Sequence, residues 1–391
     1  MSAVLQASRR QHAMLPARVR QRLDVNLIVY AGLLLGIGLV MVASASIGIA
    51  DRLTGDPLYY FKRQLVFVAA GLAAIALVYG VRLEWWRRIS LPALIGMVLL
   101  LALVLVPGVG KTVNGSSRWL AFGGFSLQVS ELAKLSVIVY LAAYVAMHGD
   151  HLRASARAFL QPLALLGMVG VLLLLEPDYG AVAVLIATSL GMLFLGGVRL
   201  WQFTVLLVGG SATLTALAMS SPYRLERITA FLNPWADPYD TGFQLTQSLI
   251  AIGSGSWWGV GLGDSIQKLF YLPEAHTDFL FAVLAEELGM MGMVSVIALY
   301  SLLVWRCFRL GRMAERCELR FAASLSFGIG MWLGLQAFIN IGVNLGILPT
   351  KGLTLPLMSA GGSSMLVVCV ALGLLLRVHR ETCDAAAEKP R

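Results

Sequence analysis

Apolar runs of about twenty residues recur along the chain, and they determine the solvent in which it folds. Of the 391 residues, 58% are hydrophobic and only 13% are charged, whereas a soluble domain carries roughly a quarter charged residues. A helix of about 20 residues crosses the roughly 30 Å hydrocarbon layer of a bilayer and pairs its own backbone polar groups. The sequence therefore predicts an all-α integral membrane protein with about ten transmembrane helices.

The apolar segments long enough to cross a membrane are separated by polar residues. They cover residues 25–47, 62–80, 89–106, 127–147, 159–175, 180–197, 201–219, 279–305, 321–343 and 353–376. The longest polar interval, residues 220–278, forms one large loop. Residues 25–377 make up a single membrane domain, with tails at residues 1–24 and 378–391.

Most of the 30 Lys and Arg residues flank the apolar segments on one side of this topology. Because cytoplasmic loops are enriched in Lys and Arg, the pattern predicts a multi-pass protein of the cytoplasmic (inner) membrane with both termini in the cytoplasm. The large loop then lies on the trans side. The net charge of +9 does not indicate nucleic-acid binding, since the basic residues are not gathered on one face.

The large loop mixes charged and amide side chains with Trp257, Trp258 and the apolar stretch 249–252. Amphipathic segments with tryptophan favour the headgroup layer of a membrane. We therefore expect short helices at the membrane interface, a location suited to an amphiphilic substrate.

Several motifs are excluded as cofactor or metal sites. The run Gly110-Lys111-Thr112 lacks the first glycine of a phosphate-binding loop, and the five histidines do not cluster with cysteine at zinc spacing. The four cysteines fall in predicted cytoplasmic segments or in the last span, so no disulfide framework is expected. No metal site or cofactor is predicted, although assistance by a divalent cation stays open.

Carboxylates inside the membrane need a partner or a function. Glu131, Glu286 and Glu287 fall in or beside predicted spans. Glu131 and Lys134 are three residues apart on one helix face, a spacing that favours a neutralising pair. The run Glu176-Pro177-Asp178 interrupts an apolar hairpin, because proline cannot continue the helical hydrogen bonds. Acidic residues at such a break avoid lipid by facing inward, which indicates a site.

Asp278 ends the large loop and directly precedes an apolar helix. Two interpretations follow from this position. An aspartate at a helix start can cap free N–H groups and favour the helix dipole without any catalytic role. Alternatively, it is a functional carboxylate at the mouth of the helical bundle.

Three motifs resemble the SEDS family, which covers shape, elongation, division and sporulation proteins. The run 340–364 reads NIGVNLGILPTKGLTLPLMSAGGSS, the run 271–289 reads YLPEAHTDFLFAVLAEELG, and GSSRWL at 115–120 precedes SELAK at 130–134. Within the family, the chain is more similar to division members than to elongation members. It departs from the usual pattern at Val129 and Ala360.

The resemblance implies a peptidoglycan glycosyltransferase that polymerises lipid II at the division septum, with Asp278 as the essential carboxylate. It also implies work with a class B penicillin-binding transpeptidase and other divisome membrane proteins.

The chemistry agrees with that implication. Attack by a sugar hydroxyl on a diphosphate-activated donor needs a base near the nucleophile and cations near the leaving group. Candidate cations on the trans side are Lys111, Arg118, Arg224, Arg227, Lys268 and Lys351. The further candidate substrate-binding residues are Glu131, Lys134, Glu176, Asp178, His276 and Ser359.

Two other functions stay open from sequence. A transporter that flips lipid II also needs inward polar groups and broken helices, although a transporter favours inverted repeats and charges near the midplane. A non-catalytic scaffold for the transpeptidase is the other alternative.

Overall fold

The structure is a computed structural model of the 391-residue chain. It describes residues 23–113, 116–122, 125–152, 156–198, 201–202, 204–205, 208–210, 212, 219, 231–238, 240, 242–269, 272, 274–350 and 352–388.

Helices account for nearly all regular structure in these residues. They are α2 (Val25–Thr54), α3 (Tyr59–Gly80), α4 (Leu83–Val104), α5 (Val129–Leu152), α6 (Ala156–Leu175), α7 (Tyr179–Leu195), α10 (Phe243–Ser254), α11 (Leu280–Arg316), α12 (Arg320–Asn344) and α13 (Gly362–Glu388), with a short 3₁₀ turn at Pro234–Ala236.

Within the described residues, seven helices are long and apolar enough to cross a membrane: α2, α3, α4, α5, α11, α12 and α13. Two shorter apolar helices, Phe159–Leu175 and Tyr179–Leu195, match two further predicted spans. Only part of the predicted span 201–219 lies within the described residues. The chain is therefore a multi-pass helical membrane protein, as the apolar runs predict.

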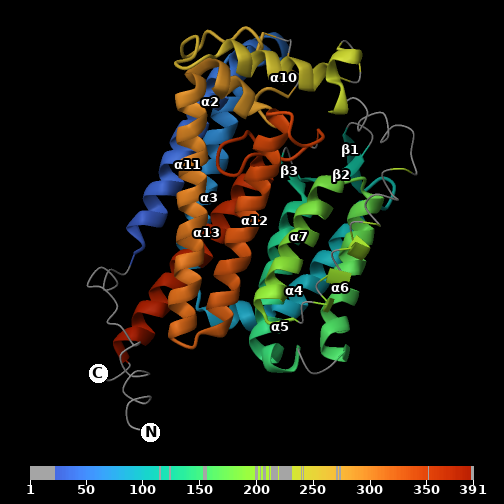
Figure 1. Ribbon diagram of the computed structural model, residues 1–391, viewed down its shortest axis with the longest axis vertical. Coiled ribbons are helices and arrows are strands. Elements are labelled where there is room, and N and C mark those ends of the chain that lie inside the picture. The colour runs from blue at the N-terminus through green and yellow to red at the C-terminus, as the bar shows by residue number, and fades with distance from the viewer. Residues whose placement is uncertain are drawn as a thin grey trace.

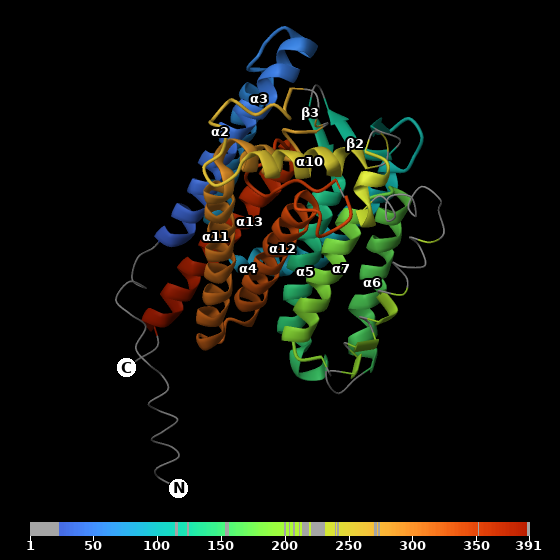
Figure 2. The ribbon, with the colours of Figure 1, turned by 45° about the horizontal axis from the view of Figure 1, so that its top comes forward.

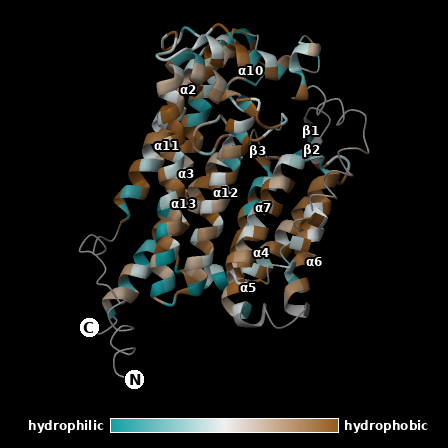
Figure 3. Cartoon of the chain, viewed as in Figure 1, coloured by the Kyte–Doolittle hydropathy of each residue, from teal (hydrophilic) through white to brown (hydrophobic). Residues whose placement is uncertain are grey.

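The long helices lie side by side in one bundle (Figure 1). α11 packs on α12 and α2, α13 packs on α3, and α5 packs on α12 and α7. The three strands and α10 lie at one end, called the loop end here, whereas the start of α2 and the end of α13 lie at the other (Figures 1 and 2). Apolar residues dominate the helices between these ends (Figure 3). The bundle thus places the strands and α10 together, away from the start of α2 and the end of α13.

A small sheet at the loop end is an exception to the all-α prediction. Strands β1 (Gly110–Val113), β2 (Ser116–Phe122) and β3 (Phe125–Gln128) pair antiparallel in the order β1-β2-β3. The predicted span 127–147 therefore starts two residues too early, because α5 begins at Val129. Residues 127 and 128 are the end of a strand that runs directly into an apolar helix, so the two elements form one apolar run.

The last predicted span also begins too early. Residues 353–361 are not helical, and α13 starts at Gly362. Leu353, Leu355 and Met358 are nevertheless buried, and the Tyr300 hydroxyl donates to the carbonyl of Pro356. Irregular backbone is tolerated at membrane depth only where protein covers it. The apolar character of this segment therefore reflects burial inside the bundle and not a lipid-facing helix.

α11 is kinked at Gly289, which has a positive φ of 64°. The backbone around Gly289 bonds to the preceding loop. The Met290 N–H donates to the carbonyl of Ser256 at 2.9 Å, and the Val260 N–H donates to the carbonyl of Glu286 at 2.9 Å. A Cβ at Gly289 would lie 2.4 Å from the backbone nitrogen of Gly259. The predicted span 279–305 is thus a short buried helix followed by a longer one that continues to Arg316.

Candidate functional site

Asp278 lies one residue before the N-cap of α11, and two amides of α12 hold the Asp278 backbone. The side-chain nitrogens of Asn340 and Asn344 donate to the Asp278 carbonyl at 2.9 and 3.1 Å. The side-chain oxygen of Asn344 accepts the N–H of Ala282 at 3.1 Å, in the first turn of α11. In this region the N-cap residue of α11 is Phe279, which makes no side-chain cap. The helix start is therefore capped by Asn344, and the Asp278 carboxylate is left for another role.

The segment around Asp278 rests on the irregular stretch before α13. The N–H of Ala360 donates to the carbonyl of His276 at 2.9 Å, and the Ser359 hydroxyl donates to the carbonyl of Thr277 at 2.5 Å. Gly352 lies beside Asp278, since a Cβ there would be 3.1 Å from Oδ2. Ser359 thus fixes the backbone of the loop, and the motifs 271–289 and 340–364 form one structure.

Burial raises the pKa of Asp278 to about 7, and the negative charges of Glu274 and Asp178 act in the same direction. Arg118 partly offsets this effect by lowering the pKa. A carboxyl whose pKa lies near the working pH can take up a proton and release it again at low cost. The charges of Arg118 on β2 and of Asp178 at the break between α6 and α7 therefore both act on Asp278.

His276 is buried, with 8% of its surface exposed. Its ring lies against Tyr60, with 4.6 Å between centroids, and burial lowers its pKa. Its Nδ1 atom has no hydrogen-bond partner in the described part of the chain. His276 is therefore a neutral ring packed beneath the loop.

The break between α6 and α7 faces inward, as predicted. Asp178 caps α7 by accepting the Ala181 N–H at 3.2 Å, and it accepts the Ser130 hydroxyl at 2.9 Å. Arg118 on β2 donates to the carbonyls of Glu176 and Pro177 at 3.0 and 2.6 Å. Its guanidinium also lies 3.9 Å from the Asp178 carboxylate. Arg118 therefore joins the sheet to the helix break.

Glu176 at the same break has no exposed surface, and neither carboxylate oxygen has a partner among the described residues. Burial raises its pKa to about 8, with a further contribution from the charge of Asp178. Glu176 is therefore mainly protonated at neutral pH.

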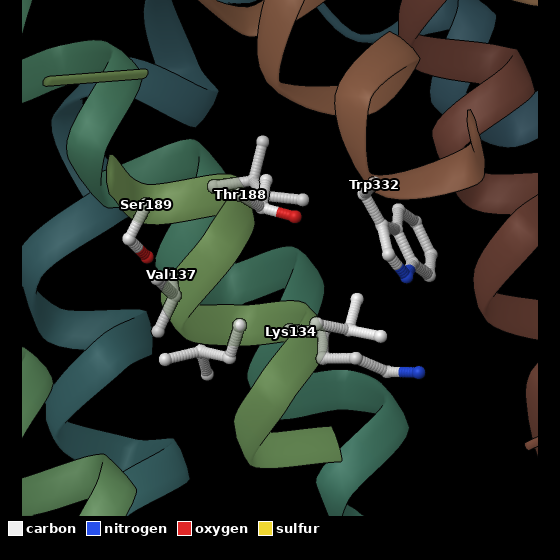
Figure 4. Close-up of a pocket in the computed structure, with 8 residues that line it drawn as sticks. Lys134, Val137, Thr188, Ser189 and Trp332 are labelled. Carbon is white, nitrogen blue, oxygen red and sulfur yellow. The ribbon is translucent and has the colours of Figure 1, made fainter. Parts of the chain in front are cut away.

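Glu131 and Lys134 form the pair that their spacing predicts, with 2.9 Å between Nζ and Oε1. Lys134 also donates to Oε1 of Gln336 at 2.7 Å and lies over the ring of Trp332. The two charges are buried between α5 and α12. Figure 4 shows Lys134 and Trp332 at a small pocket with Thr188 and Ser189. This pair lies in the interior of the bundle.

Lys268 is committed to a separate network. Its ammonium lies 2.7 Å from the Glu287 carboxylate and 2.9 Å from the Ser44 hydroxyl. Glu286 accepts the Ser265 hydroxyl at 2.5 Å and the Ile266 N–H at 3.1 Å. These contacts attach the loop to α2 and α11. They also give Glu286 and Glu287, the two acids of the predicted span 279–305, hydrogen-bonding partners.

The remaining cations fall elsewhere. Lys111 is exposed on β1. Arg224, Arg227 and Lys351 lie outside the described residues. No group of three metal-ligating side chains occurs in the part of the chain that the structure describes.

Sequence reasoning missed the amide residues that organise this site. Gln336, Asn340 and Asn344 recur every four residues on one face of α12, a spacing that places them on one stripe. Amides inside an apolar helix need partners, so this spacing was a usable signal. It does not identify the partners, because Asn340 and Asp278 are 62 residues apart.

Known proteins resemble the chain over nearly its whole length. A profile of the FtsW, RodA and SpoVE family, described as cell cycle proteins, matches residues 25–384. A protein of Thioalkalivibrio sulfidiphilus (strain HL-EbGR7), named probable peptidoglycan glycosyltransferase FtsW, is 60% identical over 98% of this chain and 96% of its own length. The chain belongs to this family. Another FtsW relative, from Nitrosococcus halophilus (strain Nc4), is 58% identical over 92% of each chain.

Solved structures of the FtsW, RodA and SpoVE family share the fold. One comes from a peptidoglycan synthase complex that coordinates polymerization and crosslinking. It is 32% identical with a TM-score of 0.76, and the match covers 92% of this chain and 98% of that one. Thermus thermophilus RodA, a rod shape determining protein, is 31% identical with a TM-score of 0.67, covering 92% and 97%.

Proposed function

We propose that this chain is a peptidoglycan glycosyltransferase that polymerises lipid II, with Asp278 as the general base. The observation that carries the proposal is that another residue, and not Asp278, caps the start of α11. Asn344 caps the helix and, with Asn340, holds the Asp278 backbone. The Asp278 carboxylate stays free of the capping role, with its pKa raised to about 7 by burial. The names of the FtsW relatives support the same activity.

The reaction follows from the chemistry of the substrates. The 4-hydroxyl oxygen of an acceptor N-acetylglucosamine attacks C1 of the donor sugar and forms the new glycosidic bond. The bond between C1 and the diphosphate oxygen breaks, and undecaprenyl diphosphate leaves with the electron pair. Asp278 takes the hydroxyl proton. An inverting transfer of this kind needs one base and no nucleoside triphosphate, because the donor already carries the activated bond.

Arg118 acts as a positioning residue in this proposal. Its guanidinium fixes the Glu176-Pro177 carbonyls and counteracts the rise in the pKa of Asp278. Replacing it with a neutral residue removes both effects.

The cellular setting extends the same proposal. We place the protein in the cytoplasmic membrane at the division septum, with both termini in the cytoplasm and the loop end on the trans side. A class B penicillin-binding transpeptidase is the proposed partner, together with other divisome proteins. The relative solved as a peptidoglycan synthase complex supports a partnership between polymerisation and crosslinking.

The test is glycan formation by purified Asp278→Ala with lipid II in detergent. The proposal expects polymer from the parent protein and from Asp56→Asn, an exposed acid paired with Lys62, and none from Asp278→Ala. Detergent provides no second compartment, so a pure transporter makes no polymer in any arm. Parental turnover by a correctly folded Asp278→Ala variant would remove the central assignment.

A further inference from the structure

Three of the cations predicted to bind substrate are bonded within the described part of the chain. Arg118 donates to two backbone carbonyls, Lys268 pairs with Glu287, and Lys134 pairs with Glu131. A cation already bonded to its own protein has less capacity to receive a diphosphate, because its donors and its charge are committed. Arg118, Lys268 and Lys134 therefore have little capacity left for the leaving group of the proposed reaction.

One face of α3 lies along the loop that carries Asp278. The ring of Tyr60 lies against His276, and the side-chain nitrogen of Gln64 donates to the carbonyl of Ser359 at 3.2 Å. One turn further on, Phe67 lies against Gly362, since a Cβ there would be 2.3 Å from the ring. Residues three and four apart share a helix face. This face is continuous with the site.

Arg63 belongs to the same face, three residues after Tyr60 and four before Phe67. It is partly buried, and its guanidinium carbon lies 5.9 Å from the centroid of the Phe67 ring. Among the described residues, no carboxylate lies within ion-pair distance of it. Its neighbour Lys62 is exposed and paired with Asp56. Within the described part of the chain, the guanidinium of Arg63 is therefore committed to no carboxylate.

Arg63 lies near the start of α3, beside apolar residues. It lies about 6 Å from the start of α3 by helical rise, and Leu65 and Val66 nearby are 41% and 55% exposed on an apolar helix. A guanidinium carries five donors and stays charged, so a partly buried one requires an anion or water as partner. The planar fork matches phosphate oxygens in pairs.

We propose that Arg63 binds the diphosphate of the lipid-linked saccharide, on the α3 face that borders the His276–Asp278 loop. The inference rests on the proposed function, because it assigns the leaving-group contact of that reaction. The polyprenyl chain then lies along the exposed apolar side of α3, and the sugar reaches Asp278. Snorkelling of Arg63 to phospholipid headgroups is the competing explanation.

The experiment measures binding of undecaprenyl diphosphate, undecaprenol and dioleoylphosphatidylglycerol to purified full-length protein in detergent. The variants are Arg63→Gln, Arg63→Lys, the matched control Lys62→Gln and the inactive Asp278→Asn. Melting temperatures without ligand confirm that each variant is folded. The proposal expects Arg63→Gln to bind the diphosphate roughly ten- to hundred-fold more weakly, the range for a lost charge-assisted contact. Arg63→Lys should recover part of this loss.

Undecaprenol and phosphatidylglycerol should bind equally to the parent protein and to Arg63→Gln, and Lys62→Gln should resemble the parent in every arm. Unchanged diphosphate binding by folded Arg63→Gln overturns the inference. An equal loss of phosphatidylglycerol binding also overturns it, because that result identifies snorkelling of Arg63 to lipid headgroups. Asp278→Asn separates the two claims. Parental diphosphate binding by this variant without polymerisation supports both, whereas retained polymerisation overturns the proposed function whatever Arg63 does.

Discussion

Asn344 holds the segment that carries Asp278 with two side-chain hydrogen bonds. Its amide nitrogen donates to the Asp278 carbonyl at 3.1 Å, and its amide oxygen accepts the Ala282 N–H at 3.1 Å. One side chain thus sets the start of a helix and the position of a carboxylate. A second bond, from Ser248 to the Asn344 carbonyl at 2.8 Å, connects α10 to the same point. The large loop is therefore fixed to the proposed catalytic residue through α12.

Asn344→Ala removes the side-chain bonds to Asp278 and Ala282 and leaves the Asp278 carbonyl held by Asn340 alone. We expect polymerisation to fall by about a hundred-fold, because a displacement of roughly 1 Å at a reacting group costs this much. Initial rates with lipid II measure the effect. Ser326→Ala on the same helix, which removes a hydroxyl bonded only to the Ala322 carbonyl, is the matched control. Equal losses in both variants would assign the effect to α12 stability and not to Asp278.

Glu176→Gln should make the protein less sensitive to alkaline pH. The pKa of Glu176 rises from an ordinary 4.5 to about 8 in the folded protein, chiefly through burial. The folded state thus binds the proton more tightly than the unfolded state, so stability is greatest below pH 4.5 and falls as pH rises through 8. Glutamine cannot ionise. Its advantage at pH 9 should be on the order of a few kcal/mol, seen as a higher melting temperature, and should vanish near pH 5.

Gly289→Ala should destabilise the protein. The residue has a φ of 64°, and an added Cβ would lie 2.4 Å from the Gly259 nitrogen, a backbone atom that cannot move aside cheaply. Positive φ in a non-glycine residue together with such a clash costs roughly 1–3 kcal/mol or more. Thermal unfolding in detergent measures the loss. Gly167→Ala in α6, where nothing lies within 4 Å of the added atom, should be neutral or stabilising; a similar loss there would contradict the stated cause.

The sequence predicted the parts of this structure that depend on local pattern. Apolar length identified the spans, and helical spacing identified the pair Glu131 and Lys134. The clamp on Asp278 was not predicted, because nothing within one helix shows which distant carbonyl an amide such as Asn340 reaches. The buried segment 353–361 was misassigned for a related reason: apolar residues covered by protein and apolar residues facing lipid have the same composition. Arg63 was not among the predicted site residues, because its proposed role becomes apparent only when the contacts of the other cations are known.

The pH dependence of polymerisation tests the role of Asp278 most directly. Burial, with Glu274 next in size, raises the pKa of Asp278 to about 7, so the reactive carboxylate form is lost as pH falls below that value. The rate at lipid II concentrations well below KM, which reports the free protein, should fall about ten-fold per pH unit on the acid side. Glu274→Gln should move the acid side of the pH–rate profile to lower pH. Asp56→Asn should leave the profile in place, because Asp56 is not among the charges that shift the pKa of Asp278. A flat profile between pH 5.5 and 8, or a limb unmoved by Glu274→Gln, would contradict proton removal by Asp278.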